Sequence, residues 1–151
     1  MAVLALFPGS FDPFTEGHEA ILRRVLPLFD KVVVAVGVNT DKQYMFSVEE
    51  RMAIIRKRMA DCLTVEGDMP AGCRRSIEVV SYSGMTIDLC HQLGAKAIIR
   101  GIRTAKDFEY EQTIAAVNRL QDPSIETLLL LADPEHVNIS STLEREKLMH
   151  K

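Results

Sequence analysis

A turn rich in glycine, proline and aspartate follows the first apolar segment and ends at His18, in the run Pro8-Gly9-Ser10-Phe11-Asp12-Pro13-Phe14-Thr15-Glu16-Gly17-His18. Thr15 is predicted to cap a helix whose first turn holds Gly17 and His18. A helix N-terminus has unsatisfied N–H donors and a partial positive charge, so this end suits a phosphate group. The run matches neither G-x-G-x-x-G nor G-x-x-x-x-G-K-[ST], which excludes the usual dinucleotide and Walker A interpretations.

Three further polar groups follow predicted strands. Arg100-Gly101-Ile102-Arg103 and Asn138-Ile139-Ser140-Ser141-Thr142 come behind later apolar segments, and Lys42 lies in the loop behind the second segment. Ligands of parallel sheets bind beyond the carboxyl ends of the strands. An imidazole, three cations and several hydroxyls gathered there would suit a polyphosphate.

Each of these groups also has a simpler explanation. A single histidine in a first helical turn is commonly a capping or surface residue, and arginine pairs and lone lysines are commonly solvated. The serines and threonine near residue 140 can serve only as caps. Convergence of four groups on one sheet edge favours ligand binding, and that convergence depends on the strand assignment.

The segment after Arg103 is predicted to be a helix with an unusual face. Asp107, Glu111, Ile114 and Asn118 recur at i, i+4, i+7 and i+11 and therefore share one side. One interpretation is a solvated face. The other has Asp107 and Glu111 contacting the arginines or the hydroxyls of a ligand, with Asn118 further along the same groove.

The elements that position these groups alternate between apolar runs and helical patterns. Continuous apolar runs are typical of parallel strands covered on both faces. The chain is therefore predicted to be α/β: a single-domain, doubly wound parallel sheet of about five strands spanning residues 1–151. The predicted strands are Ala2–Phe7, Lys31–Val38, Ile77–Tyr82, Ala95–Arg100 and Thr127–Ala132.

Capping residues predict where the helices begin and end. Pro27 should bend or end the first helix, and Gly94 should close the third. Ser47-Val48-Glu49-Glu50 and Ser141-Thr142-Leu143-Glu144 are predicted capping boxes. A longer helix is predicted from Lys106 to Leu120, and residues 61–75 are predicted to be a surface loop.

Composition narrows the class of protein. The chain has 151 residues and a net charge of −3, without the basic excess of nucleic-acid binders. Cys62, Cys73 and Cys90 match no metal or redox spacing and are expected to be reduced thiols in a cytoplasmic protein. No apolar run approaches the roughly 20 residues of a membrane helix, and no basic n-region of a signal peptide is present, so no membrane association is expected.

Thr15-Glu16-Gly17-His18 and Ile139-Ser140-Ser141-Thr142-Leu143-Glu144-Arg145 match the (H/T)-x-G-H and I-S-S-T-x-x-R signatures of a nucleotidyltransferase superfamily. Three further segments resemble the bacterial phosphopantetheine adenylyltransferase family. They are the turn from Pro8, the run Met45-Phe46-Ser47-Val48-Glu49-Glu50-Arg51, and Arg100-Gly101-Ile102-Arg103 with Asp107-Phe108-Glu109-Tyr110-Glu111. This resemblance covers nearly the whole chain. It implies a Rossmann-like nucleotidyltransferase fold, the substrates ATP and 4′-phosphopantetheine, the cofactor Mg²⁺, and a homohexamer.

The resemblance also implies roles for residues at matching positions. Ser10 and His18 would contact phosphate, with His18 stabilising the transition state together with Lys42 and Arg103. Lys42, Thr86 and Arg100 would hold phosphopantetheine, and Ser10 and Asn118 are assigned to the same acceptor site. The ATP site would contain, besides Ser10 and His18, Phe11, Gly101, Ile102, Arg103, Glu111, His136, Val137, Asn138, Ile139, Ser140, Ser141 and Thr142. No carboxylate cluster marks a metal site, so Mg²⁺ is expected to be held by substrate phosphates and water.

Two departures from the family pattern and two rival functions remain at this point. The segment 61–75 is longer than the family leads one to expect, and the tail after Arg145 is short. A nicotinamide mononucleotide adenylyltransferase or a cytidylyltransferase would share the motif ending at Arg145, although the acidic and aromatic block after Arg103 favours the pantetheine enzyme. A nucleotide-binding sensor that holds ATP without turnover is the non-enzymatic alternative.

Overall fold

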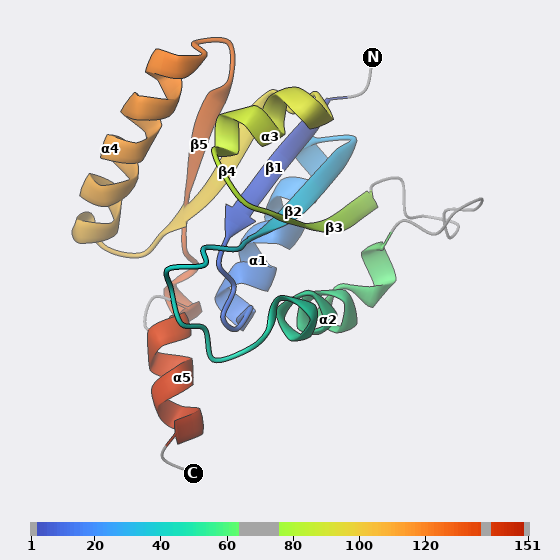
Figure 1. The fold of residues 1–151 in the computed structure, drawn as a ribbon, viewed down its shortest axis with the longest axis vertical. Helices are drawn as coiled ribbons and strands as arrows, with labels where there is room; N and C mark the ends of the chain where they lie inside the picture. Colours follow the sequence, from blue (N-terminus) through green and yellow to red (C-terminus); the bar gives the residue numbers. More distant parts are fainter. Residues whose placement is uncertain (1–2, 64–75, 137–139, 150–151) are drawn as a thin grey trace.

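A single parallel sheet organises the molecule. The computed structural model describes residues 3–63, 76–136 and 140–149, and within them five strands pair in the order β3-β2-β1-β4-β5 (Figure 1). All neighbouring strands are parallel, which confirms the predicted doubly wound α/β fold. The strands are β1 (Leu4–Gly9), β2 (Lys31–Gly37), β3 (Ser76–Tyr82), β4 (Ala97–Ile102) and β5 (Glu126–Leu131).

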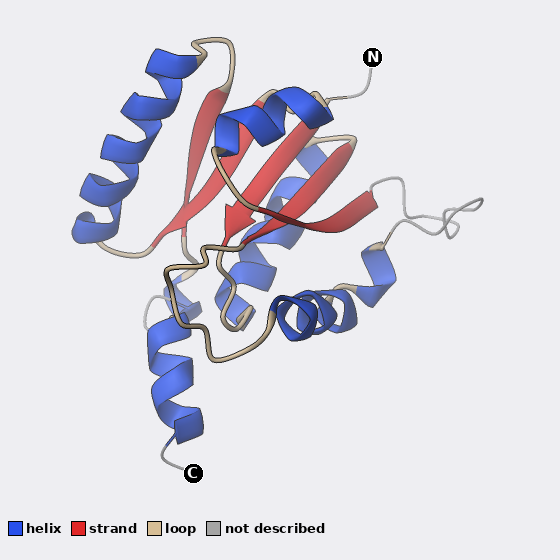
Figure 2. Cartoon of the chain, in the orientation of Figure 1, coloured by secondary structure: helices blue, strands red, loops and turns tan. Residues whose placement is uncertain are grey.

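Helices lie on both faces of this sheet (Figure 2). The first two helices share a core with one face, the third packs on the opposite face, and the fourth contacts both the third helix and β4. The last helix lies beyond the carboxyl ends of the strands (Figure 1). The helices are α1 (Glu16–Val25), α2 (Val48–Arg58), α3 (Thr86–Leu93), α4 (Ala105–Gln121) and α5 (Ser141–Met149).

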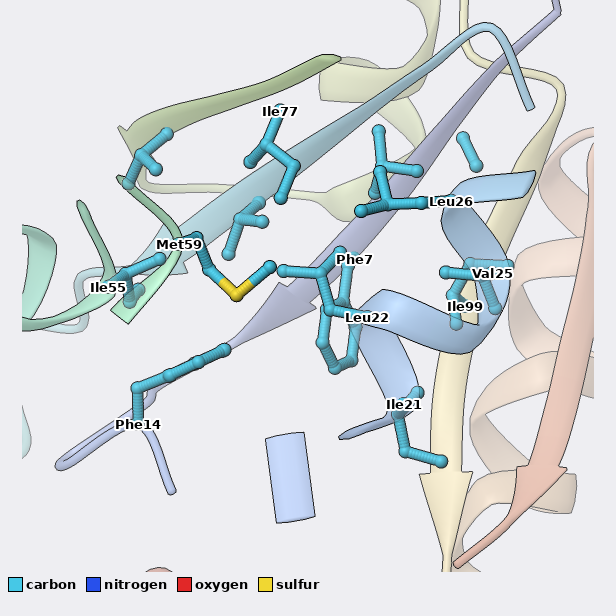
Figure 3. Close-up of a cluster of buried hydrophobic side chains, with 14 of the residues drawn as sticks. Phe7, Phe14, Ile21, Leu22, Val25, Leu26, Ile55, Met59, Ile77 and Ile99 are labelled. Atoms are coloured by element: carbon cyan, nitrogen blue, oxygen red, sulfur yellow. The ribbon is translucent and has the colours of Figure 1, made fainter. Parts of the chain in front are cut away.

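The two cores explain the continuous apolar runs of the central strands. In β1, Ala5 and Phe7 point into the core under α1 and α2, whereas Leu6 points into the core under α3. Successive side chains of a strand alternate between faces, so a strand covered on both sides must be apolar throughout. Figure 3 shows the first of these cores, where Phe7 lies among Leu22 of α1 and Met59, which follows α2.

The ends predicted from capping residues in the first three helices are confirmed. Thr15 caps α1, and Ser47 forms the capping box of α2 with Glu50. α1 ends at Val25, directly before the short helix that contains Pro27. Gly94 closes α3 in the left-handed conformation with φ of 75°.

Several boundaries differ from the prediction. β1 continues to Gly9, because Pro8 and Gly9 pair with β2. β4 continues past its predicted end at Arg100 to Ile102, because Gly101 and Ile102 also pair with β5. α5 begins at Ser141, so the cap is Ser140, whose Oγ accepts from Leu143 N at 3.1 Å.

Edge strand β5 was wrongly predicted to be covered on both faces. Leu131 is 69% exposed and Leu128 is 38% exposed, so this edge of the sheet presents apolar surface. In the described part of the chain, every helix is too short or too polar to cross a lipid bilayer. Of the predicted loop 61–75, Asp61 and Cys62 belong to a short helix at Ala60–Cys62, and residues 64–75 lie outside the described residues.

Candidate active site

Two adjoining cavities open near the carboxyl ends of the strands, around the boundary between β1 and β4. The chain leaves β1 toward β2 on one side and later returns to β4 on the other, so strand order reverses there. The larger cavity has a volume of about 690 Å³ and the smaller about 370 Å³. Both are lined by Pro8, Gly9, Ser10, Arg100, Tyr110 and Glu111. A ligand group held near Ser10 and Arg100 is therefore within reach of either cavity.

His18 lines the smaller cavity from the first turn of α1. Its Nδ1 accepts a hydrogen bond from Thr15 N at 2.9 Å, while Thr15 Oγ1 accepts from His18 N at 3.3 Å. The histidine thus occupies the position that Glu or Gln holds in an ordinary capping box. Because Nδ1 is an acceptor, the proton of the neutral ring must reside on Nε2. The cap therefore leaves His18 with one N–H donor that Thr15 does not use.

The surroundings of His18 disfavour a charged ring. The imidazole is stacked against Phe14 at 5.4 Å between centroids and meets the edge of Phe11 at 5.0 Å. Burial, and then the positive charges of Arg100 and Arg103, lower the pKa of His18 from 6.5 to about 3. At neutral pH the ring is uncharged and offers a hydrogen bond, not a positive charge.

The turn after β1 has a constrained backbone. Phe11 adopts a positive φ of 48°, and its ring lies over Gly9. A Cβ at Gly9 would come within 2.9 Å of that ring, so only glycine fits there without displacing Phe11. Phe11 is 3% exposed and lines the smaller cavity. The ring therefore supports His18 and closes one wall of the cavity.

The carboxylate of Asp12 ties this turn to the loop behind β2. Asp12 is 5% exposed and accepts hydrogen bonds from Met45 N at 2.9 Å and Phe46 N at 3.0 Å. These bonds place the loop that carries Lys42 against the turn that carries Ser10.

The last helix holds the same turn from the other side. Arg145 Nη1 donates to Asp12 O at 2.6 Å, and Ser141 Oγ donates to Pro13 O at 2.8 Å. Arg145 also donates to Thr142 Oγ1 at 3.2 Å and lines the smaller cavity. Residues more than a hundred positions apart in the sequence thus form one wall.

Arg100 is oriented by a carboxylate from α4. Its Nε and Nη2 donate to Glu111, at distances from 2.7 to 3.0 Å, and its Nη1 donates to Pro8 O. Glu111 is 4% exposed, so the solvated-face interpretation of this helix is wrong at this position. Geometry of this bidentate kind fixes the guanidinium in one plane at the boundary of the two cavities.

Arg103 lines the smaller cavity and is held less tightly. Asp107 Oδ2 accepts from Arg103 N at 3.1 Å and lies 3.6 Å from Arg103 Nε. The predicted contact between the acids of α4 and the arginines is therefore confirmed for both pairs. Both arginines line the smaller cavity together with His18, and their positive charges lower its pKa.

The larger cavity contains the remaining predicted acceptor residues. Lys42, Thr86 and Asn118 line it, together with all three tyrosines of the chain. Tyr82 Oη lies 3.2 Å from Thr86 Oγ1. Lys42 lines this cavity, while His18 and Arg103 line its neighbour, so the three predicted catalytic residues stand on two sides of the shared boundary.

The predicted ATP residues are distributed as follows. Ile102 is 7% exposed and lines neither cavity among the described residues. Val137, Asn138 and Ile139 lie outside the described residues. The other predicted ATP residues line the smaller cavity, namely Ser10, Phe11, His18, Gly101, Arg103, Glu111, His136, Ser140, Ser141 and Thr142. Their individual roles stay predictions.

Sequence reasoning missed Asp12, Arg145, the three tyrosines and Arg51. Asp12, Arg145, Tyr110 and Arg51 stand inside motifs that were recognised, so their positions alone were a usable signal. The burial of Arg51 had no local signal, because an arginine between a capping box and an apolar stripe is expected to be solvated, yet Arg51 is only 1% exposed. Its contacts with Ser10 and Gly37 place it directly beneath the site.

The acids of the site are poorly suited to hold a metal ion by themselves. Within residues 3–63, 76–136 and 140–149, no group of three or more His, Cys, Asp or Glu side chains could hold one. Asp107 and Glu111 already accept from Arg103 and Arg100. The described side chains therefore provide no dedicated cage for Mg²⁺.

Comparison with known proteins agrees with this geometry. The cytidylyltransferase-like family model matches residues 6–147. Solved structures that resemble the fold include a bifunctional NMN adenylyltransferase/ADP ribose pyrophosphatase from Francisella tularensis, with a TM-score of 0.67, 19% identity, and coverage of 99% of this chain and 43% of that one. A putative nicotinate-nucleotide adenylyltransferase from Vibrio parahaemolyticus has a TM-score of 0.64 at 19% identity, covering 99% of this chain and 88% of that one. At such identities the likeness shows the fold alone.

Curated relatives are much more similar in sequence. The phosphopantetheine adenylyltransferase of Flavobacterium psychrophilum is 45% identical over 142 residues, which cover 94% of this chain and 85% of that protein. Its counterpart in Leuconostoc citreum is 47% identical, covering 95% of this chain and 82% of that protein. Identity at this level over most of both chains reflects common descent, and we therefore assign the protein to the phosphopantetheine adenylyltransferase family and, more broadly, to the cytidylyltransferase-like family.

Proposed function

We propose that the protein transfers AMP from ATP to 4′-phosphopantetheine, giving dephospho-coenzyme A and pyrophosphate, a step of coenzyme A biosynthesis. Membership of the family supports this reaction. The observation that carries it is the pair of cavities that meet at Ser10 and Arg100. Two phosphorylated substrates lying in adjoining cavities bring their phosphates together at that shared boundary.

The chemistry of the linings favours one assignment of substrates. The smaller cavity has His18, Arg103 and Arg145 with the hydroxyls at the start of α5, which suits the phosphates of ATP. The larger cavity is lined by one lysine, Lys42, and also by the hydroxyl of Thr86 and the amide of Asn118. That pattern suits a phosphate followed by an amide-containing chain, as in phosphopantetheine.

The reaction needs no general base. A phosphate oxygen of the acceptor forms a bond to the α-phosphorus of ATP, while the bond from that phosphorus to the bridging oxygen breaks and pyrophosphate leaves. The attacking phosphate is already an anion, so no proton has to be removed from it. Rate acceleration then comes from alignment of the two phosphates and from stabilisation of negative charge on the transferring group.

His18 is suited to that stabilisation. His18 lines the smaller cavity, and Thr15 orients its ring through Nδ1, which leaves Nε2–H as a neutral donor. Arg103 supplies positive charge on the same side, and Lys42 supplies it from the acceptor side. Donors fixed before the substrate arrives need no reorganisation as charge develops.

Mg²⁺ is proposed to enter as the complex with ATP, where it neutralises phosphate charge. This agrees with acids that are already engaged by arginines and with the reluctance of Mg²⁺ to lose its waters.

A pyrophosphate-release assay tests the reaction. Purified protein with ATP and Mg²⁺ should release pyrophosphate with 4′-phosphopantetheine and not with nicotinamide mononucleotide or a phosphorylated sugar alcohol. His18→Ala should lower kcat by a factor on the order of 10²–10³, as for loss of one transition-state donor. Pyrophosphate release with another acceptor, and not with 4′-phosphopantetheine, would show that the proposed substrate is wrong. ATP binding without any pyrophosphate release would favour a nucleotide-binding sensor.

We also propose that the protein assembles with itself, as a homohexamer, in the cytoplasm. Self-assembly is supported by large apolar side chains on α4 and β5 that are exposed in the single chain. A reducing compartment is supported by the free, buried thiol of Cys90.

A further inference from the structure

Arg51 is a buried cation in the first turn of α2. It is 1% exposed and has the largest volume among the fully buried side chains. Its Nη1 donates to Ser10 O at 2.8 Å and to Gly37 O at 3.0 Å. One nitrogen therefore joins the turn behind β1 to the end of β2.

Arg51 has no ion-pair partner among the described residues. Within the same ranges, its Nε has no hydrogen-bond partner. Its contacts are two carbonyl oxygens and the ring of Tyr44, whose centroid lies 4.0 Å from Cζ. A buried charge without a counter-ion is costly, so a purely structural need would be met more easily by an apolar side chain.

The contacts of Arg51 continue to Lys42. Tyr44, stacked on the guanidinium, accepts a hydrogen bond at its Oη from Asn39 N at 3.0 Å. Asn39 O in turn accepts from Lys42 N at 3.0 Å. Gly37, Asn39, Lys42 and Tyr44 all line the larger cavity, and Ser10 lines both cavities. The guanidinium thus lies at the base of the loop that presents Lys42.

We infer that Arg51 is a positioning residue for the phosphorylated acceptor. It holds the loop that carries Lys42 in place through Tyr44 and fixes the carbonyl of Ser10. Its unbalanced charge adds to the positive field beneath the larger cavity, and the phosphate of the acceptor provides the missing countercharge. The effect on the acceptor rests on the proposed function, whereas the effect on the loop does not.

Kinetics of three variants test the effect on the acceptor. Arg51→Met should raise KM for 4′-phosphopantetheine about tenfold, with KM for ATP and kcat at saturation changing less than about threefold. Arg51→Lys keeps the charge without the planar fork, so its acceptor KM should fall between those of wild type and Arg51→Met. Arg56→Met is the matched control: Arg56 is exposed on the same helix, donates to Val79 O and lines neither cavity among the described residues. It should leave both KM values unchanged.

Hydrogen exchange tests the loop without relying on turnover. Amides of residues 39–46 should exchange about tenfold faster in Arg51→Met than in wild type, and at the wild-type rate in Arg56→Met. Unchanged amide exchange in Arg51→Met overturns the inference, even if the KM for 4′-phosphopantetheine rises in that variant. A rise of both KM values by the same factor, or a lower active fraction with unchanged KM, also overturns it by indicating a general structural role. An inactive wild type would refute the proposed function, and loop exchange would still decide the role of Arg51.

Discussion

His18 packs against the rings of Phe11 and Phe14, shares the smaller cavity with Arg100 and Arg103, and accepts a hydrogen bond at Nδ1 from Thr15 N. At neutral pH, an imidazole with a pKa near 3 lacks the second ring proton that an imidazolium would give up as a general acid. It still donates through Nε2–H, and that donation is unaffected by pH across the physiological range. Burial among rings, which looks unfavourable for a catalytic histidine, is therefore what keeps its role as a neutral donor constant.

The lowered pKa of His18 predicts a pH-dependent stability. Between pH 6.5 and about 3, the unfolded chain binds a proton on His18 that the native chain does not bind. Lowering the pH through this window therefore lowers the free energy of unfolding, by about 2 kcal/mol between pH 7 and pH 5. Urea unfolding at both pH values measures this loss. The part that comes from His18 should be present in wild type and absent in His18→Gln, because the other titrating groups contribute equally to both proteins.

His91→Gln is the matched control for that measurement. His91 is exposed, and its Nε2 lies 2.6 Å from Asp122 Oδ2. This variant should keep the wild-type loss attributed to His18. If the free energy of unfolding falls equally in His18→Gln and in wild type between the two pH values, His18 is not held neutral in the folded protein.

At the scale of elements, helix ends position most of the site. The cap of α1 orients His18, the start of α5 presents hydroxyls, and the end of α3 returns the chain to β4. Gly94 makes that return in the left-handed region, where nothing lies within 4 Å of an added Cβ. Any penalty for a side chain at Gly94 is therefore one of backbone conformation alone.

Gly94→Ala should lower the free energy of unfolding by about 1 kcal/mol, because residues with a Cβ disfavour the left-handed region. Gly94→Asn should lose less, since asparagine tolerates this conformation. Urea unfolding of both variants measures the difference. Pyrophosphate release should match wild type in each, because Gly94 lines neither described cavity. Equal losses in the two variants would contradict a conformational cause.

Local rules predicted these elements well because their causes are local. The threonine before α1, the serine before α2 and the glycine after α3 act on their own neighbours. Strand ends were less accessible, since Gly101 and Ile102 belong to β4 only through pairing with β5. The cap of α5 was misplaced by one residue because Glu144 makes Ser141 the better capping box in sequence. In the fold, Ser140 accepts from Leu143 N, whereas Ser141 donates to Pro13 O.

For the whole molecule, the notable feature is apolar surface along α4 and β5. Leu120 is 87% exposed, Leu131 is 69% exposed and Val117 is 49% exposed. Glu111 is the buried residue of α4, so the helix does little to bury its own apolar side chains in the single chain. Contact with further copies would remove this surface from water, at roughly 1.5–3 kcal/mol for each leucine fully buried.

Sedimentation velocity checks this assembly. Wild type should sediment with a mass six times that of the single chain, and Leu120→Lys should shift toward smaller species because a buried lysine is costly. Leu28→Lys, which changes a leucine that is 67% exposed near the end of α1, should leave the mass unchanged. A monomeric wild type, or a Leu120→Lys variant of wild-type mass, would contradict self-assembly through α4.

The convergence of the site also belongs to this scale. Motifs predicted which residues carry the chemistry, and parallel strands predicted that they would meet at one edge. Tertiary contacts supplied what motifs could not: the pairing of Glu111 with Arg100, the burial of Arg51, and the division of Lys42 from His18 between two cavities. Such features depend on which helix packs beside which strand, and no local pattern encodes that.

The bonds from Arg145 and Ser141 to the turn at Asp12 and Pro13 have a consequence for biosynthesis. A ribosome makes this turn more than a hundred residues before it makes these partners. The nascent polypeptide can therefore pair its strands before it can close this wall of the smaller cavity. The wall is thus completed after the sheet on which it stands.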